Sequence, residues 1–194
     1  MSTTNLFVEL LVIGVGAACW VLLVLGGAVP LQEIPAPWLR SYPLLLVSLA
    51  FLYVFGIITD RMADWTFDRL FSGGIRARFF DSKRAYQDAR RLVLSSSPRL
   101  ADQHEYGRTR IRISRGWALN SVLCAFVLAM HSLRLPEHSP YTAETALSGS
   151  IVFLGLAISA WWSWRLLVNF EYLKIREHAE FLRNEPLLKL HRAA

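Results

Sequence analysis

The stretch "EYGRTRIRISRGWALN", residues 105–120, marks a change from charged to apolar sequence. Directly before an apolar run that continues to residue 134 stand four arginines: Arg108, Arg110, Arg112 and Arg115. A run of about 20 apolar residues can cross a bilayer as a helix. The stretch therefore predicts a membrane-spanning helix with a basic group at one end.

The whole chain has the composition of a membrane protein. Of its 194 residues, 54% are hydrophobic and only 19% are charged, whereas soluble domains are about 25% charged. Three more apolar runs occur, at residues 6–29, 43–59 and 147–168. We therefore expect an all-α membrane protein with four transmembrane helices, the first retained rather than cleaved as a signal peptide.

The basic residues are distributed unevenly between the segments that join these runs. Residues 62–115 hold twelve Lys and Arg and residues 171–194 hold five, whereas the short links 30–42 and 135–146 hold only Arg40. Because positive loops stay in the cytoplasm, we expect the long segment and both termini to be cytoplasmic. The chain is therefore expected to cross the membrane several times.

Proline positions predict that the helices extend beyond the bilayer. Ser97 and Pro98 read as an N-cap and a first helical position, and no proline follows until Pro136. A helix over 98–134 would be about 55 Å long at roughly 1.5 Å per residue, against a hydrocarbon core of about 30 Å. We expect the excess to form a cytoplasmic helical storey.

This layout divides the chain into four parts. The pair Gly73-Gly74 is expected to end the second span's helix, and residues 78–95 have the pattern of a short amphipathic helix. A second uninterrupted helix is expected over about 147–184, ahead of Pro186. The expected parts are transmembrane helices 1 and 2 (1–61), a basic helical domain (62–115), transmembrane helices 3 and 4 (116–170) and a C-terminal cytoplasmic helix (171–194).

The arginines of the opening stretch have several possible roles. Arg108, Arg112 and Arg115 share one helix face, and the second span ends with Asp60, Asp64 and Asp68 at helical spacing. In antiparallel helices these would form the structural ion pairs Asp60–Arg115, Asp64–Arg112 and Asp68–Arg108. Anchoring of the span end by positive charge is an alternative, and the alternation in "RTRIRIS" leaves a β-strand open.

Other basic residues are left for an anionic ligand. Residues 62–115 carry a net charge of +6, from twelve basic and six acidic side chains, with aromatic residues among them. Basic groups bind phosphates and aromatic rings stack on bases, so an oligonucleotide or nucleotide ligand is one reading, and anionic lipid headgroups are the other. The candidate contacts are Arg78, Lys83, Arg84, Arg90, Arg91 and Arg110.

The first apolar run contains one ionisable residue, Glu9. A carboxylate within a membrane span is a functional candidate by default, and the alternative is an ion pair at the interface with Arg115 or Arg165. Gly14 and Ala18 follow in the small-xxx-small spacing that lets helices approach closely. We expect Glu9, Gly14 and Ala18 to serve a pore or assembly, with the close approach either within or between subunits.

Four spans and the basic segment 62–115 together resemble the membrane effectors of bacterial anti-phage defence, in outline the membrane subunit of the Hailong system. The resemblance rests on architecture and assigns no individual residue. It implies a homo-oligomeric channel whose cytoplasmic helices bind a DNA oligomer made by a partner nucleotidyltransferase. It also implies a location in the bacterial inner membrane. The expected number of subunits is four, a tetramer.

The functional expectation is a gated oligomeric channel or membrane-disrupting effector. No catalytic motif, Gly-rich phosphate loop or Cys/His metal pattern occurs in the sequence, so we expect neither an enzyme nor a cofactor. The alternative is a non-conducting accessory or structural subunit of a membrane complex, whose basic domain docks an acidic protein partner.

Overall fold

The computed structural model describes residues 3–28, 42–96, 98–134 and 142–193, and all regular structure within them is helical. Four of these helices are long and apolar enough to cross a membrane, which confirms the predicted class of multi-pass, all-α protein. The candidate spans are Leu6–Gly26, Tyr42–Arg76, Pro98–Leu133 and Ala143–Asn184.

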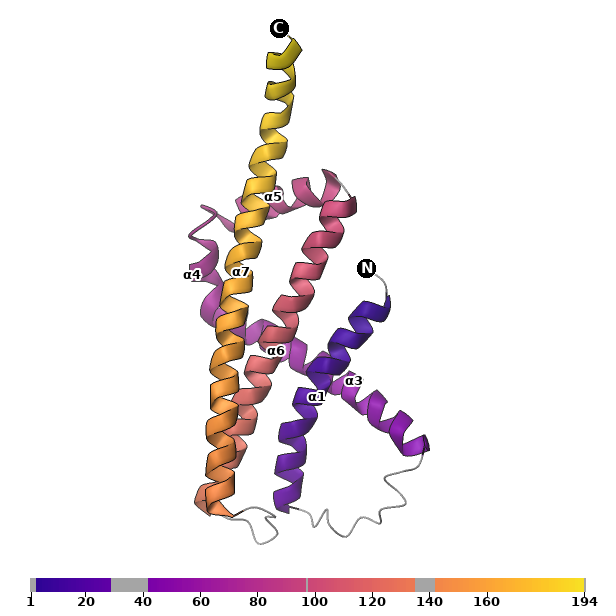
Figure 1. The fold of residues 1–194 in the computed structure, drawn as a ribbon, viewed down its shortest axis with the longest axis vertical. Helices are drawn as coiled ribbons and strands as arrows, with labels where there is room; N and C mark the ends of the chain where they lie inside the picture. Colours follow the sequence, from indigo (N-terminus) through magenta and orange to yellow (C-terminus); the bar gives the residue numbers. More distant parts are fainter. Residues whose placement is uncertain (1–2, 29–41, 97, 135–141, 194) are drawn as a thin grey trace.

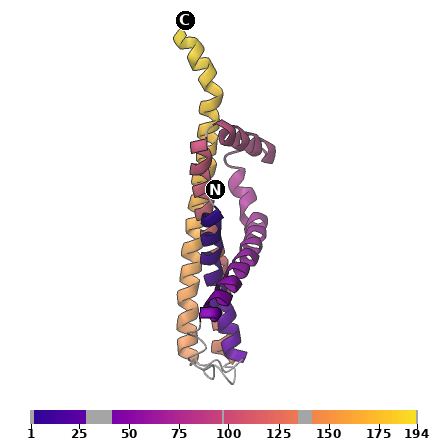
Figure 2. The same cartoon turned by 90° about the vertical axis from the view of Figure 1, so that its right-hand side faces the viewer.

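The long axis of the molecule is an antiparallel pair of helices, α6 (Pro98–Arg134) and α7 (Ala143–Ala193), which lie side by side in both views (Figures 1 and 2). Helix α6 has the predicted bounds and length, 37 residues, which rules out the β-strand reading; the predicted N-cap, Ser97, lies outside the described residues. Helix α7 is longer than predicted, because its 51 residues continue through Pro186.

Helices α1 (Thr3–Ala28) and α3 (Tyr42–Phe67) complete the apolar end. They cross where two glycines meet backbone: a Cβ on Gly14 would lie 1.8 Å from the Leu52 carbonyl oxygen, and one on Gly56 would lie 1.9 Å from that of Leu10. The small-residue face at Gly14 therefore packs within the subunit, and Ala18 on it is half-buried. Helix α3 runs obliquely across the other helices (Figure 1).

The glycine pair does not end the second span's helix, so that prediction was wrong. The helix widens into a π turn, η2 (Asp68–Ser72), and continues as α4 (Gly73–Arg76). Both glycines keep negative φ, and nothing lies within 4 Å of where their side chains would be. The left-handed conformation that makes glycine a helix stop is absent here, and the helix ends at Arg76, three residues later than expected.

The predicted amphipathic helix is α5 (Lys83–Ser96), which packs across α6 and α7 at the polar end (Figure 1). Its apolar side chains Ala89 and Val93 are buried against Ile175 and Ala179 of α7. Nearer the spans, a second core joins Phe67, Ala118 and Trp164, with the rings of Phe67 and Trp164 edge to face at 4.7 Å. The polar end of the helices thus has a core of its own.

Candidate functional site

The end of α3 is joined to α6 by one arginine that holds two aspartates. Nη2 of Arg115 donates to Oδ1 of Asp60 at 2.9 Å, and its Nη1 pairs with Asp64. The Asp60 side chain is 6% exposed and that of Asp64 is 54% exposed. The Asp60–Arg115 pair is confirmed, whereas the partner predicted for Asp64 was wrong.

Arg112 pairs instead with Glu9, across α6 and α1. Its Nη1 lies 3.4 Å from Oε2 of Glu9, and the Thr109 hydroxyl donates to the other carboxylate oxygen. Only 4% of the Glu9 side chain is exposed. Glu9 is therefore an ion-paired group that fixes α1 against α6; the expected interface pairing holds, with Arg112 in place of Arg115 or Arg165.

The third predicted pair, Asp68–Arg108, does not form. Neither side chain has an ion-pair partner among the described residues. Asp68 follows the end of α3, and because α3 runs obliquely to α6 (Figure 1), the two helices do not stay in register as far as Asp68 and Arg108. Arg108 is therefore left as an exposed cation rather than a structural partner.

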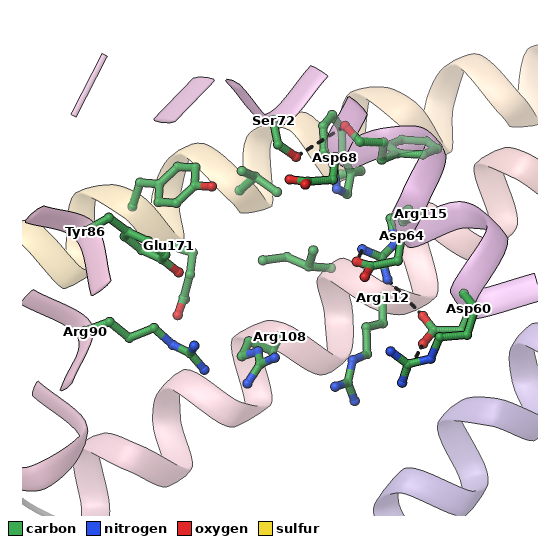
Figure 3. Close-up of a pocket in the computed structure, with 16 residues that line it drawn as sticks. Asp60, Asp64, Asp68, Ser72, Tyr86, Arg90, Arg108, Arg112, Arg115 and Glu171 are labelled. Carbon is green, nitrogen blue, oxygen red and sulfur yellow. Dashed lines mark hydrogen bonds and ion pairs between the residues drawn. The ribbon is translucent and has the colours of Figure 1, made fainter. Parts of the chain in front are cut away.

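Arg108 belongs to the wall of a polar pocket of about 250 Å³ between α3, α5, α6 and α7 (Figure 3). Arg90 of α5 faces it, and its guanidinium points toward Arg108 (Figure 3). Arg90 also has no ion-pair partner among the described residues, and the same two arginines line a smaller cavity of about 160 Å³ next to it. This corner of the pocket therefore carries two positive charges that form no ion pair with a described residue.

Carboxylates and aromatic rings complete the pocket wall. The carboxylates are Asp60, Asp64, Asp68 and Glu171, of which the first two share Arg115 as an ion-pair partner. Tyr86 and Tyr172 lie edge to face, with ring centroids 5.1 Å apart. Burial raises the pKa of the Tyr86 hydroxyl, and the nearby Glu171 carboxylate adds to this while Arg90 opposes it. Tyr86 therefore remains a neutral hydrogen-bond donor throughout the physiological pH range.

The structure also brings together a chain of polar groups that sequence reasoning missed. Nδ1 of His104 donates to Oε1 of Glu171 at 2.7 Å, and its Nε2 lies 3.3 Å from Nδ1 of His178. His104 is 4% exposed, and Gly107 makes room for the carboxylate, because a Cβ there would lie 2.7 Å from Oε2 of Glu171. In the described part of the chain no three His, Cys, Asp or Glu side chains are grouped so that they could hold a metal.

The predicted ligand residues are split between the pocket and the open surface. Only Arg90 lines the pocket. The guanidinium of Arg110 lies 5.9 Å from the centre of the exposed Tyr106 ring, away from the pocket wall. The remaining four predicted residues are exposed on α5 or in the turn before it: Arg78, Lys83, Arg84 and Arg91.

Comparison of the chain with protein-family models, with curated proteins and with solved structures finds no match to any of them.

Proposed function

We propose that the chain is a homo-oligomeric membrane channel or membrane-disrupting effector that is gated by a phosphate-bearing ligand at its basic end. The observation that carries the proposal is the pair Arg90 and Arg108, which line one pocket from two helices and form no ion pair with a described residue. Two guanidinium groups side by side repel each other, and a phosphate bound between them removes the repulsion.

The volume of the pocket limits how much of such a ligand can lie inside it. Pockets for drug-sized ligands measure about 300–1,000 Å³, and this one holds about 250 Å³. One phosphate with its nucleoside suits that volume, with the base against Tyr86 and Tyr172. The rest of an oligonucleotide would then follow the exposed basic residues of α5, Lys83, Arg84 and Arg91.

Gating follows from which elements the pocket joins. Its wall includes Arg115 and Asp60, where α6 holds the end of α3, and Arg90 on α5. A ligand that draws α5 toward α6 therefore acts on the same end of α6 that fixes two other spans, α1 through Arg112 and α3 through Arg115. The proposal places this basic end in the cytoplasm of a bacterial cell, as the charge distribution predicts. The anti-phage role and the partner nucleotidyltransferase belong to the same proposal.

Binding is tested by titrating purified protein in detergent with labelled short DNA, short RNA and cyclic nucleotides at two salt concentrations. Replacing Arg90 and Arg108 together by Ala is expected to weaken binding at least about tenfold, because charge-assisted hydrogen bonds contribute about 1.5–3 kcal/mol each. Affinity should fall with salt, and the variant should have a shallower salt dependence.

The matched control is the replacement of Arg84 and Arg91 together by Ala. These residues lie on α5, as Arg90 does, but outside the pocket wall. This variant should lower affinity for long oligonucleotides more than for a single nucleotide. Equal losses from both double variants with a single nucleotide would contradict the pocket as the site. Current through reconstituted planar bilayers, recorded with and without the bound ligand, tests the gating half of the proposal; a chain that conducts in neither state is not a channel.

A non-conducting accessory subunit is the second candidate. The observation in its favour is the set of exposed basic side chains on and before α5, Arg78, Lys83, Arg84 and Arg91, none of which forms an ion pair in the described structure. Such a surface suits an acidic protein partner. The test replaces these four residues together by Ala. If this quadruple variant loses a co-purifying acidic protein while the double variant of Arg90 and Arg108 keeps it, this candidate is favoured.

A further inference from the structure

A second hollow lies within the spans and is almost wholly apolar. It measures about 310 Å³ and lies between the end of α3, α6 and α7. Its floor is made by the buried Ala118 and Ala157, and its rim by side chains that are half exposed on the outside of the molecule, Val122 and Leu154 among them. We name this hollow the apolar groove; it opens toward the surrounding lipid.

One end of the apolar groove lies beside an arginine, Arg165, that has no counter-ion among the described residues. The ring of Trp161 lines the groove, whereas its indole N–H is buried away from the groove surface. The guanidinium of Arg165 lies 5.6 Å from the centre of the same indole ring. This end of the groove therefore places a positive charge beside an apolar hollow.

The distance between the two ends of the groove matches the depth of one lipid leaflet. Leu154, Ile158 and Trp161 lie on one face of α7, and Arg165 continues that face one turn later. At roughly 1.5 Å per residue, Leu154 and Arg165 are about 16 Å apart along the helix. This is close to half of the hydrocarbon core of about 30 Å, the depth of one leaflet.

The geometry points to a binding site for one anionic glycerophospholipid in the apolar groove. An acyl chain fills the hollow between the Trp161 ring, Val122 and Leu154, and the phosphate lies against Arg165. The groove is too small for a whole lipid, so the second chain lies outside it in the bilayer. This site is separate from the Arg90–Arg108 pocket and does not depend on the proposed channel function.

The chain offers a matched control for the test. The guanidinium of Arg69 lies 5.8 Å from the centre of the Trp65 ring, which repeats the pair Arg165–Trp161, but neither Arg69 nor Trp65 lines the groove. Any general attraction of anionic lipid to an arginine over an indole therefore also acts at Arg69, which is the more exposed of the two arginines. Lipid retention that depends on the groove should be lost when Arg165 or Trp161 is replaced, and not when Arg69 or Trp65 is replaced.

The experiment is native mass spectrometry of the full chain in detergent with added phosphatidylglycerol or phosphatidylcholine. We expect one phosphatidylglycerol retained per protomer in preference to phosphatidylcholine. Its affinity should fall about tenfold in Arg165→Gln, as expected for loss of a charge-assisted contact, and it should also fall in Trp161→Phe and in the groove-filling variant Val122→Trp. Arg69→Gln and Trp65→Phe should leave it unchanged.

Several results would overturn the site. If Arg69→Gln and Arg165→Gln lower the lipid affinity equally, the lipid is attracted to basic side chains in general. If phosphatidylglycerol and phosphatidylcholine are retained equally, the proposed contact between the headgroup and Arg165 is wrong. Crosslinking between two copies through Val122→Cys, with no lipid retained, would mean that a second copy covers the groove. Because Val122 is half exposed, its substitutions are tolerated by the fold, and unchanged thermal unfolding of each variant verifies this.

Discussion

Replacing Gly56 by leucine is expected to destabilise the protein by at least about 3 kcal/mol, because the new side chain meets backbone rather than a movable side chain. Its Cβ would lie 1.9 Å from the carbonyl oxygen of Leu10 and 2.7 Å from the carbonyl carbon. No rotamer relieves this clash, so α1 and α3 must separate along their crossing. Thermal unfolding in detergent, followed by circular dichroism, measures the loss.

Gly155→Leu is the matched control. Gly155 also lies in a membrane-spanning helix, but nothing is found within 4 Å of where its Cβ would be. Its substitution should change stability by no more than about 0.5 kcal/mol, as for an open surface position. If Gly56→Leu and Gly155→Leu unfold at the same temperature, the close crossing of α1 and α3 is contradicted.

The reciprocal glycine gives a sharper check of the same contact. Gly14→Ala places a Cβ 1.8 Å from the Leu52 carbonyl oxygen. Since either substitution alone separates the two helices, the double variant Gly14→Ala with Gly56→Ala should cost less than the sum of the two single variants. Additive losses would indicate two independent sites instead of one crossing.

The main helices could be predicted from the sequence because hydropathy and proline positions depend on local physics. Pro98 begins α6 because proline lacks an N–H that the first helical turn does not need. The predicted helix end at Gly73 and Gly74 was wrong because glycine does not fix the backbone conformation as proline does. Glycine permits a helix stop without requiring one, and here the helix continues through both residues.

The ion pairs could be predicted only where the helices stay close together. Arg115 meets Asp60 because α6 and α3 cross there, but α3 runs obliquely (Figure 1), so the two helices do not stay in register as far as Asp68 and Arg108. A straight antiparallel ladder needs parallel axes over several turns. The Arg112–Glu9 pair depends on where α1 packs, which no local pattern in the sequence encodes.

The group Glu171–His104–His178 lacks any motif spacing, yet a signal for it existed. Helices α6 and α7 are joined by a short link, so residues equally distant from that link lie opposite each other. Ser150 donates to the carbonyl oxygen of Ala125 in this way, and His104 meets Glu171 in the same register. Extending the hairpin register to the polar end would have placed His104 beside Glu171.

Replacing Arg115 by glutamine is expected to cost about 3–5 kcal/mol, because it leaves a buried carboxylate without its counter-charge. Asp60 is the group concerned: its side chain is 6% exposed, and its other neighbouring cation, Arg61, lies 4.0 Å away and is 73% exposed. Asp60→Asn in the Arg115→Gln background should restore much of the loss, since the buried charge is then removed. Unfolding by heat in detergent again supplies the measurement.

The two aspartates that Arg115 holds should differ strongly in a double-mutant cycle. Asp64 is 54% exposed, so Asp64→Asn should cost no more than about 1 kcal/mol, and its coupling to Arg115 should be small beside that of Asp60. A charge swap between Asp64 and Arg112 tests the alternative of a straight ladder. It should not recover stability, because Arg112 pairs with Glu9 and an acidic residue at position 112 would face that buried carboxylate. Recovery by this swap would show that α3 and α6 form a straight antiparallel ladder of ion pairs and that Arg115 does not bridge Asp60 and Asp64.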